Sequence, residues 1–134
     1  MPFYKWDPQL LSVHVGPMDD EHQILIKKMN SLYDAHARKA PKAELEKLLK
    51  DFANYTVEHF KDEEKYMESI AYKGIDSHKL IHKKLLGQVS TYVEEFGKTG
   101  ALTDAFFRFL GAWLTTHIRG IDMKYGENSE KAAA

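Results

Sequence analysis

Five histidines and two carboxylates recur at helical spacing along this chain. The set comprises His22, His59, Glu63, His78, His82, His117 and Asp122. Within it, His59 precedes Glu63 by four residues, and the next two histidines have the same spacing. Side chains four residues apart leave one face of an α-helix one turn apart, so such a pair can reach a single metal ion. The pattern therefore indicates a metal site built from nitrogen and oxygen donors.

Four amphipathic segments predict the helices that position these residues. We expect them at residues 19–39, at 41–71, from a cap at Asp76 or Ser77 to a stop at Gly97, and at 101–119. Asp19 or Asp20 is the expected N-cap of the first helix, and Gly74 the expected stop of the second. Because the connections are short, consecutive helices should run antiparallel. The predicted fold is all-α, an up-down-up-down antiparallel four-helix bundle.

Residues 1–17 contain three prolines and Gly16, which break any helical pattern. We therefore expect an irregular N-terminal arm, with Trp6 as a plug over the core. The chain of 134 residues then forms a single domain, residues 1–134, which ends in a tail at 127–134. A domain of this size buries roughly 68% of its unfolded surface, enough for one hydrophobic core.

Composition excludes several classes of protein. The 19 basic and 20 acidic residues nearly cancel, so neither nucleic acid nor an anionic membrane is an expected partner. The chain has no cysteine, which excludes disulfides and thiolate metal sites. It has no apolar signal segment at its N-terminus and no run of about 18 apolar residues, so we expect no membrane insertion and a soluble, cytoplasmic protein.

An antiparallel bundle brings all seven donors to one end. His22 opens the first helix, while His59 and Glu63 lie late in the second, which returns to that end. The third helix begins there and the fourth finishes there. His36 is the contrasting case, because it lies 14 residues after His22, about 21 Å along a helix, and is read as a surface or rim residue. His14, in the arm, is read as a surface residue or as one that contacts a ligand from outside, and not as a ligand.

Seven protein ligands exceed the four that one tetrahedral zinc ion accepts. Two metal ions bridged by the two carboxylates, with the imidazoles as terminal ligands, would satisfy the count and leave room for an external ligand. Imidazole and carboxylate together suit iron, while manganese and zinc stay open on the ligand types alone.

At these residues the chain resembles the hemerythrin family, and more closely the bacteriohemerythrins. The matching stretches are Val15-Gly16, Asp20-Glu21-His22, His59-x-x-x-Glu63 with Glu64 and Met67, His78-x-x-x-His82, and Trp113-Leu114-x-x-His117-x-x-x-x-Asp122. All seven ligand positions of the family pattern are present.

The resemblance implies a role for each donor. His78, His82 and His117 would bind one iron, and His22 and His59 a second iron that keeps an open position for O2. Glu63 and Asp122 would bridge the two Fe ions beside an oxo or hydroxo bridge. The residues that match the family's O2 pocket are Leu25, Phe60, Trp113, Leu114 and Ile118.

The expected function is reversible O2 binding at a non-haem di-iron centre, for oxygen transport, storage, delivery or sensing, and not enzymatic catalysis. The alternatives are a di-iron redox enzyme, a responder to NO or peroxide, and an O2-sensing or redox-sensing regulatory domain of a longer protein. O2 is the expected ligand, and a redox or oxygen-consuming protein is the expected kind of partner.

Asp62 and Glu64 are read as part of a solvated helix face.

Overall fold

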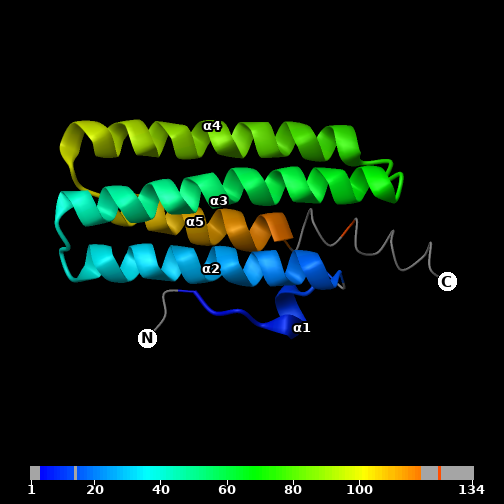
Figure 1. The fold of residues 1–134 in the computed structure, drawn as a ribbon, viewed down its shortest axis with the longest axis horizontal. Helices are drawn as coiled ribbons and strands as arrows, with labels where there is room; N and C mark the ends of the chain where they lie inside the picture. The colour runs from blue at the N-terminus through cyan, green and yellow to red at the C-terminus, as the bar shows by residue number, and fades with distance from the viewer. Residues whose placement is uncertain (1–3, 14, 119–123, 125–134) are drawn as a thin grey trace.

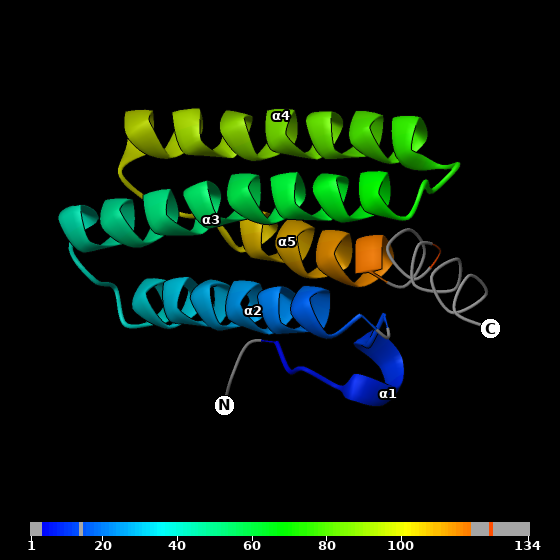
Figure 2. The same cartoon turned by 45° about the vertical axis from the view of Figure 1, so that its right-hand side comes forward.

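The structure, a computed structural model, describes residues 4–13, 15–118 and 124. Its helices are α1 (Pro8–Leu11), α2 (Gly16–Ala37), α3 (Lys42–Ser69), α4 (Ile75–Thr99) and α5 (Asp104–His117). Figure 1 and Figure 2 show α2 to α5 side by side, each reversed relative to the one before it, with α1 outside the bundle. The predicted antiparallel four-helix bundle is confirmed. None of the described helices has the length and apolar content needed to cross a bilayer.

Each long helix buries one stripe of side chains, and α3 shows the pattern most clearly. Its buried residues are Leu45, Leu49, Phe52, Thr56, His59, Phe60, Glu63 and Met67. Steps of three and four residues keep these side chains on one face, which must be covered by neighbouring helices. The stripe carries an imidazole and a carboxylate at positions where its other members are mostly apolar.

The beginning of α2 differs from the prediction. The helix begins at Gly16 with Pro17 in its first turn, where the missing N–H of proline costs no hydrogen bond. Val15 is the N-cap, so the predicted cap at Asp19 or Asp20 is wrong. Asp19 instead accepts hydrogen bonds from Ser12 Oγ at 2.6 Å and Val13 N at 2.8 Å. Its carboxylate ties the N-terminal arm to the helix.

Two further helix ends were also misplaced. Gly74 is the N-cap of α4 and not the stop of α3, which ends at Ser69. Gly97 lies inside α4, which continues to Thr99 and is ended by Gly100 in the left-handed conformation, φ 72°. The N–H of Gly100 donates to the Phe96 carbonyl at 2.7 Å, as expected of a glycine that closes a helix.

The N-terminal arm packs against the bundle. It contains the one-turn helix α1, which the prediction of an irregular arm did not include. The backbone N–H of Tyr4 donates to Asn30 Oδ1 at 2.7 Å, and Asn30 Nδ2 donates to the Tyr4 carbonyl at 2.7 Å. Trp6 is partly buried against the core, in agreement with its predicted place. The two hydrogen bonds between Tyr4 and Asn30 hold the arm along the outer side of α2.

Candidate metal centre

Six of the seven predicted donors lie buried at one end of the bundle. They are His22 of α2, His59 and Glu63 of α3, His78 and His82 of α4, and His117 of α5, each at most 4% exposed. Asp122, the seventh, lies outside the described residues. The fold therefore gathers side chains from positions 22 to 117 into one buried polar cluster.

The cluster divides into two groups that share Glu63. One group comprises Glu63, His78, His82 and His117, and the other comprises His22, His59 and Glu63. Within each group the possible ligand atoms all lie within 4.8 Å of one another. Each group thus has the nitrogen and oxygen donors, and the spacing, to surround one metal ion.

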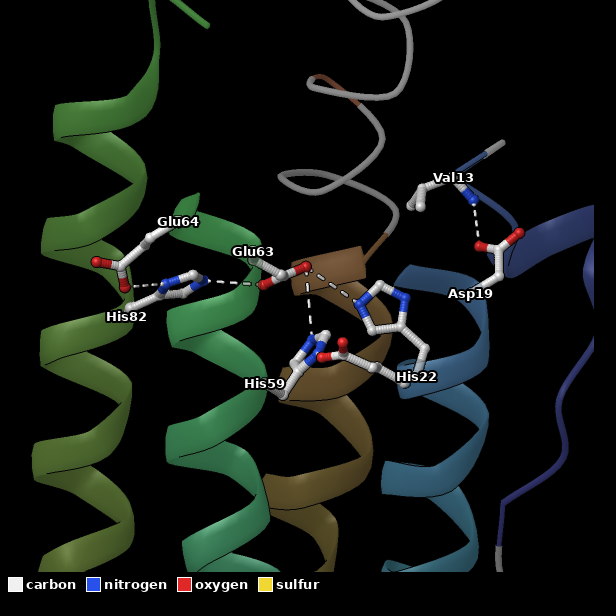
Figure 3. Close-up of polar contacts among 8 residues, drawn as sticks. Val13, Asp19, His22, His59, Glu63, Glu64 and His82 are labelled. Atoms are coloured by element: carbon white, nitrogen blue, oxygen red, sulfur yellow. Dashed lines mark hydrogen bonds and ion pairs between the residues drawn. The ribbon is translucent and has the colours of Figure 1, made fainter. Parts of the chain in front are cut away.

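The two carboxylate oxygens of Glu63 face different groups (Figure 3). Oε2 lies 3.2 Å from His22 Nε2 and 3.5 Å from His59 Nε2. Oε1 lies 3.2 Å from Nε2 of His82. A carboxylate placed in this way can give one oxygen to each of two ions, as a bridging ligand does.

Two of the imidazoles lie between two carboxylates. His59 Nδ1 donates to Glu21 Oε1 at 2.9 Å, while its Nε2 faces Glu63. His82 repeats the arrangement, because its Nδ1 donates to Glu64 Oε2 at 3.0 Å. A neutral imidazole has a single N–H, so the Nε2 lone pair points toward the Glu63 carboxylate. The lone pair of Nε2 and the negatively charged carboxylate repel each other. A cation bound between the nitrogen and the carboxylate oxygen replaces this repulsion with coordination, so the residues fit a metal ion.

Glu64 is a site residue that sequence reasoning placed wrongly. Its side chain is 29% exposed and accepts a hydrogen bond from His82, so the prediction of a solvated face is wrong for this residue. The sequence feature that could have identified Glu64 was its position next to Glu63, at the edge of the apolar stripe where α4 packs. Glu21, next to His22, has the matching place at the edge of α2 and is 19% exposed.

Burial, together with Glu21 and Asp62, raises the pKa of Tyr55 to about 12.

Two apolar residues, Phe60 and Trp113, contact donor rings, His82 and His117 respectively. The five predicted pocket residues, Leu25, Phe60, Trp113, Leu114 and Ile118, are all at most 6% exposed. Phe60 stacks on the His82 ring with centroids 3.8 Å apart and planes 4° apart. The buried indole N–H of Trp113 has no hydrogen-bond partner among the described residues. The predicted lining is therefore apolar except for this indole N–H, which is a hydrogen-bond donor.

An apolar groove of 410 Å³ opens between α4 and α5 beside this cluster. It is lined by Ile81, Leu85, Phe109, Ala112, Trp113, Thr116 and His117. His117 thus belongs both to the buried cluster and to the wall of a groove on the surface.

Of the two remaining histidines, the structure describes His36, which is separate from the cluster. His36 lies at the other end of α2, 23% exposed, with its Nε2 3.2 Å from Asp104 Oδ1. Its predicted place at the surface agrees with this position. His14 lies outside the described residues.

Comparisons with known proteins agree with the geometry. A family model described as "Hemerythrin HHE cation binding domain" matches residues 14–127. The chain is 34% identical to a myohemerythrin of Theromyzon tessulatum over 123 residues, which are 91% of this chain and 90% of the relative. It is 32% identical to a bacteriohemerythrin of Methylococcus capsulatus over 128 residues, 94% and 96% of the two chains.

Solved structures give the same result. The crystal structure of a wild-type hemerythrin superposes with a TM-score of 0.85 at 31% identity, covering 92% of this chain and 95% of that one. A leucine-to-alanine variant of a hemerythrin superposes with a TM-score of 0.88 at 30% identity, covering 96% and 98%. With the family model, these likenesses in sequence and fold show that the chain belongs to the hemerythrin family.

Proposed function

We propose that this protein binds O2 reversibly at a non-haem di-iron centre, in the service of oxygen transport, storage, delivery or sensing. The observation that carries the proposal is the position of Glu63, whose two oxygens face two separate histidine groups. A single metal ion would not need a carboxylate directed to both sides, whereas a pair of ions does.

The two groups define the ligands of each iron. His78, His82 and His117 would hold one ion, and His22 and His59 the other. Glu63 would bridge them, and Asp122 would be the second bridge by its match to the family pattern. Two ferrous ions held by these residues would supply the electrons for reversible O2 binding. Imidazole nitrogen and carboxylate oxygen are donors that suit iron.

One group has three histidines and the other has two, so the two ions would have different roles. An ion with three histidines and two bridging carboxylates is close to a full coordination shell. The ion held by His22 and His59 has one protein ligand fewer, which leaves a position for an external molecule. In this proposal O2 would bind the ion held by His22 and His59.

The surrounding side chains would protect the bound ligand from water. Leu25 and Leu114 are each 1% exposed, and Ile118 is fully buried. With Phe60 and Trp113 they would form an apolar lining that limits the access of water and acids to the open position. No side chain of this lining can act as an acid, base or nucleophile, which favours a binding protein over an enzyme. We also propose a cytoplasmic location and a redox or oxygen-consuming protein as the partner.

The test is optical spectroscopy of anaerobically reduced, iron-loaded protein before O2 is added, after it is added and after it is removed. We expect a visible charge-transfer band that appears with O2 and disappears when O2 is removed. Immediate oxidation without this band, or catalytic turnover in the presence of reductant, would favour a redox enzyme.

A matched pair of histidine variants makes the test specific. His59→Ala removes a ligand of the open iron and should abolish the O2 band. His36→Ala removes a histidine at the other end of α2 and should leave the band unchanged. A normal band in His59→Ala would contradict the ligand assignment.

A further inference from the structure

Two carboxylates outside the predicted ligand set make direct contact with it. Glu21 of α2 and Glu64 of α3 lie at the edge of the cluster, 19% and 29% exposed. Each accepts a hydrogen bond from the Nδ1 of one buried histidine. Glu21 accepts it from His59, and Glu64 accepts it from His82 (Figure 3). The two contacts are distributed evenly, with one in each of the two metal groups.

Such a hydrogen bond changes what the imidazole can do. It places the proton on Nδ1, which leaves the Nε2 lone pair directed into the site, and it holds the ring in one orientation. The negative charge behind the ring also makes Nε2 a stronger donor, which favours the ferric over the ferrous ion. A carboxylate in this place therefore affects both the retention of the metal and the ease of its oxidation.

The surroundings of the two rings differ. The His82 ring is already fixed by Phe60, which stacks on it at 3.8 Å with planes 4° apart. The His59 ring is not stacked on Phe60, whose centroid is 5.9 Å away with the planes at 45°. It has an edge-to-face contact at 4.7 Å with His22, which is itself a predicted ligand. Orientation of His59 therefore depends on Glu21 more than orientation of His82 depends on Glu64.

We propose that Glu21 and Glu64 are positioning residues with separable roles, which rests on the di-iron function proposed above. Glu21 sets both the orientation and the donor strength of His59, and thereby the affinity of the open iron. Glu64 acts on His82 mainly through its charge, and thereby sets the ease with which the three-histidine iron is oxidised.

Paired substitutions separate orientation from charge. Glu21→Gln and Glu64→Gln keep an oxygen that accepts the hydrogen bond but remove the charge, whereas Glu21→Leu and Glu64→Leu remove both. The control is Glu58→Gln, which makes the same charge change at an exposed residue next to His59 in the chain. Iron loss to a chelator, the autoxidation rate in air, and the imidazole ¹⁵N shifts of the metal-free protein are measured for all five variants and the wild type.

The proposal predicts a distinct result for each pair. Glu21→Leu should lower iron affinity by about 10- to 100-fold, the usual effect of losing such an outer partner, and Glu21→Gln should restore most of it. Glu64→Leu should retain iron better than Glu21→Leu. Both Glu64 variants should autoxidise more slowly than wild type, because His82 becomes a weaker donor to ferric iron.

The metal-free measurement is independent of iron chemistry. In the wild-type protein, the ¹⁵N shifts should place the proton of His59 and His82 on Nδ1. That preference should survive in the Gln variants and disappear at His59 in Glu21→Leu.

The results distinguish the failure of this proposal from the failure of the proposed function. If the wild type takes up two irons but the four variants match Glu58→Gln in iron loss and autoxidation, the roles assigned to Glu21 and Glu64 are wrong. Equal effects of Glu21→Leu and Glu64→Leu on iron loss would overturn the separation between them. If the wild type does not take up two irons, the di-iron function fails, and this proposal fails with it.

Discussion

The two ends of the bundle are built from the same four helices but are filled by different kinds of side chain. The end where α5 begins is packed with aromatic and aliphatic groups such as Phe106, Phe107 and Leu32, each at most 1% exposed. At the end where α5 finishes, six polar side chains of the described residues are buried in the equivalent stripe positions. The apolar end gains stability by excluding water, whereas the polar end keeps groups whose burial is costly unless they bind a metal ion.

The difference shows how one helical pattern can serve two purposes. Throughout α3 the stripe repeats every three or four residues, and the change from Leu45 and Leu49 to His59 and Glu63 does not interrupt it. The apolar half gains stability from packing alone, whereas the other half combines buried apolar residues such as Leu114 with the buried donors. Substitution of a donor and substitution of a core residue at the apolar end should therefore have opposite consequences.

Substitution of the shared carboxylate should have the largest effect. Glu63→Leu removes the ligand common to both groups, and we expect iron affinity to fall by more than about 100-fold, beyond the effect of losing an outer partner. The free energy of unfolding of the metal-free protein should not fall, because the variant no longer buries an ionised carboxylate. Iron content per chain and urea unfolding of the metal-free protein measure the two effects.

A substitution at the apolar end is the matched comparison for this result. Phe106→Ala should lower the free energy of unfolding by about 3–5 kcal/mol with or without iron, and leave iron content unchanged in the folded fraction. If Glu63→Leu destabilised the metal-free protein as much as Phe106→Ala does, the contrast between the two ends would be wrong.

A pair of leucines on α5 tests the boundary between the two ends. Leu114→Ala opens space in the predicted O2 lining, so water should enter and autoxidation should become several-fold faster, with iron retained. Leu110→Ala, one turn earlier and equally buried, should cost similar stability, about 2–5 kcal/mol, without changing autoxidation. The rate of colour loss in air, compared for the two variants, measures the difference. Equal rates would remove Leu114 from the O2 lining.

The smallest effect is expected at the start of α5. Thr103 Oγ1 accepts a hydrogen bond from the Phe106 backbone N–H at 3.2 Å and caps the helix. Thr103→Ala should lower the free energy of unfolding by about 1 kcal/mol, measured by urea unfolding. Iron content and the O2 band should not change, because the cap lies at the apolar end. A loss of iron in this variant would show that the two ends are coupled.

Much of the fold and the site could be predicted from the sequence because the donors replace apolar residues in a strong helical stripe. His59 and Glu63 stand out for this reason, and short connections then determine which helix ends meet. The helix ends were less predictable. Asp19 has the chemistry of an N-cap, but its carboxylate is used by Ser12 and Val13, so a tertiary contact replaced the local one.

Glu64 shows a second limit of the sequence. Its neighbours in the chain are charged, and charged runs on helices usually face solvent. Only the position of α4 reveals that His82 lies within hydrogen-bonding distance of this carboxylate. Contacts at the edge of a helix face depend on the neighbouring helix, which periodicity within one segment does not describe.

In the proposed centre, Glu63 joins two metal sites at one end of the bundle. Anaerobic titration of the metal-free protein with ferrous iron, followed by iron analysis of the desalted protein, tests it most directly. We predict two irons per chain for the wild type and fewer than one for Glu63→Leu. A wild-type protein that retains one iron or none, or a Glu63→Leu variant that retains two, would contradict the shared-carboxylate centre.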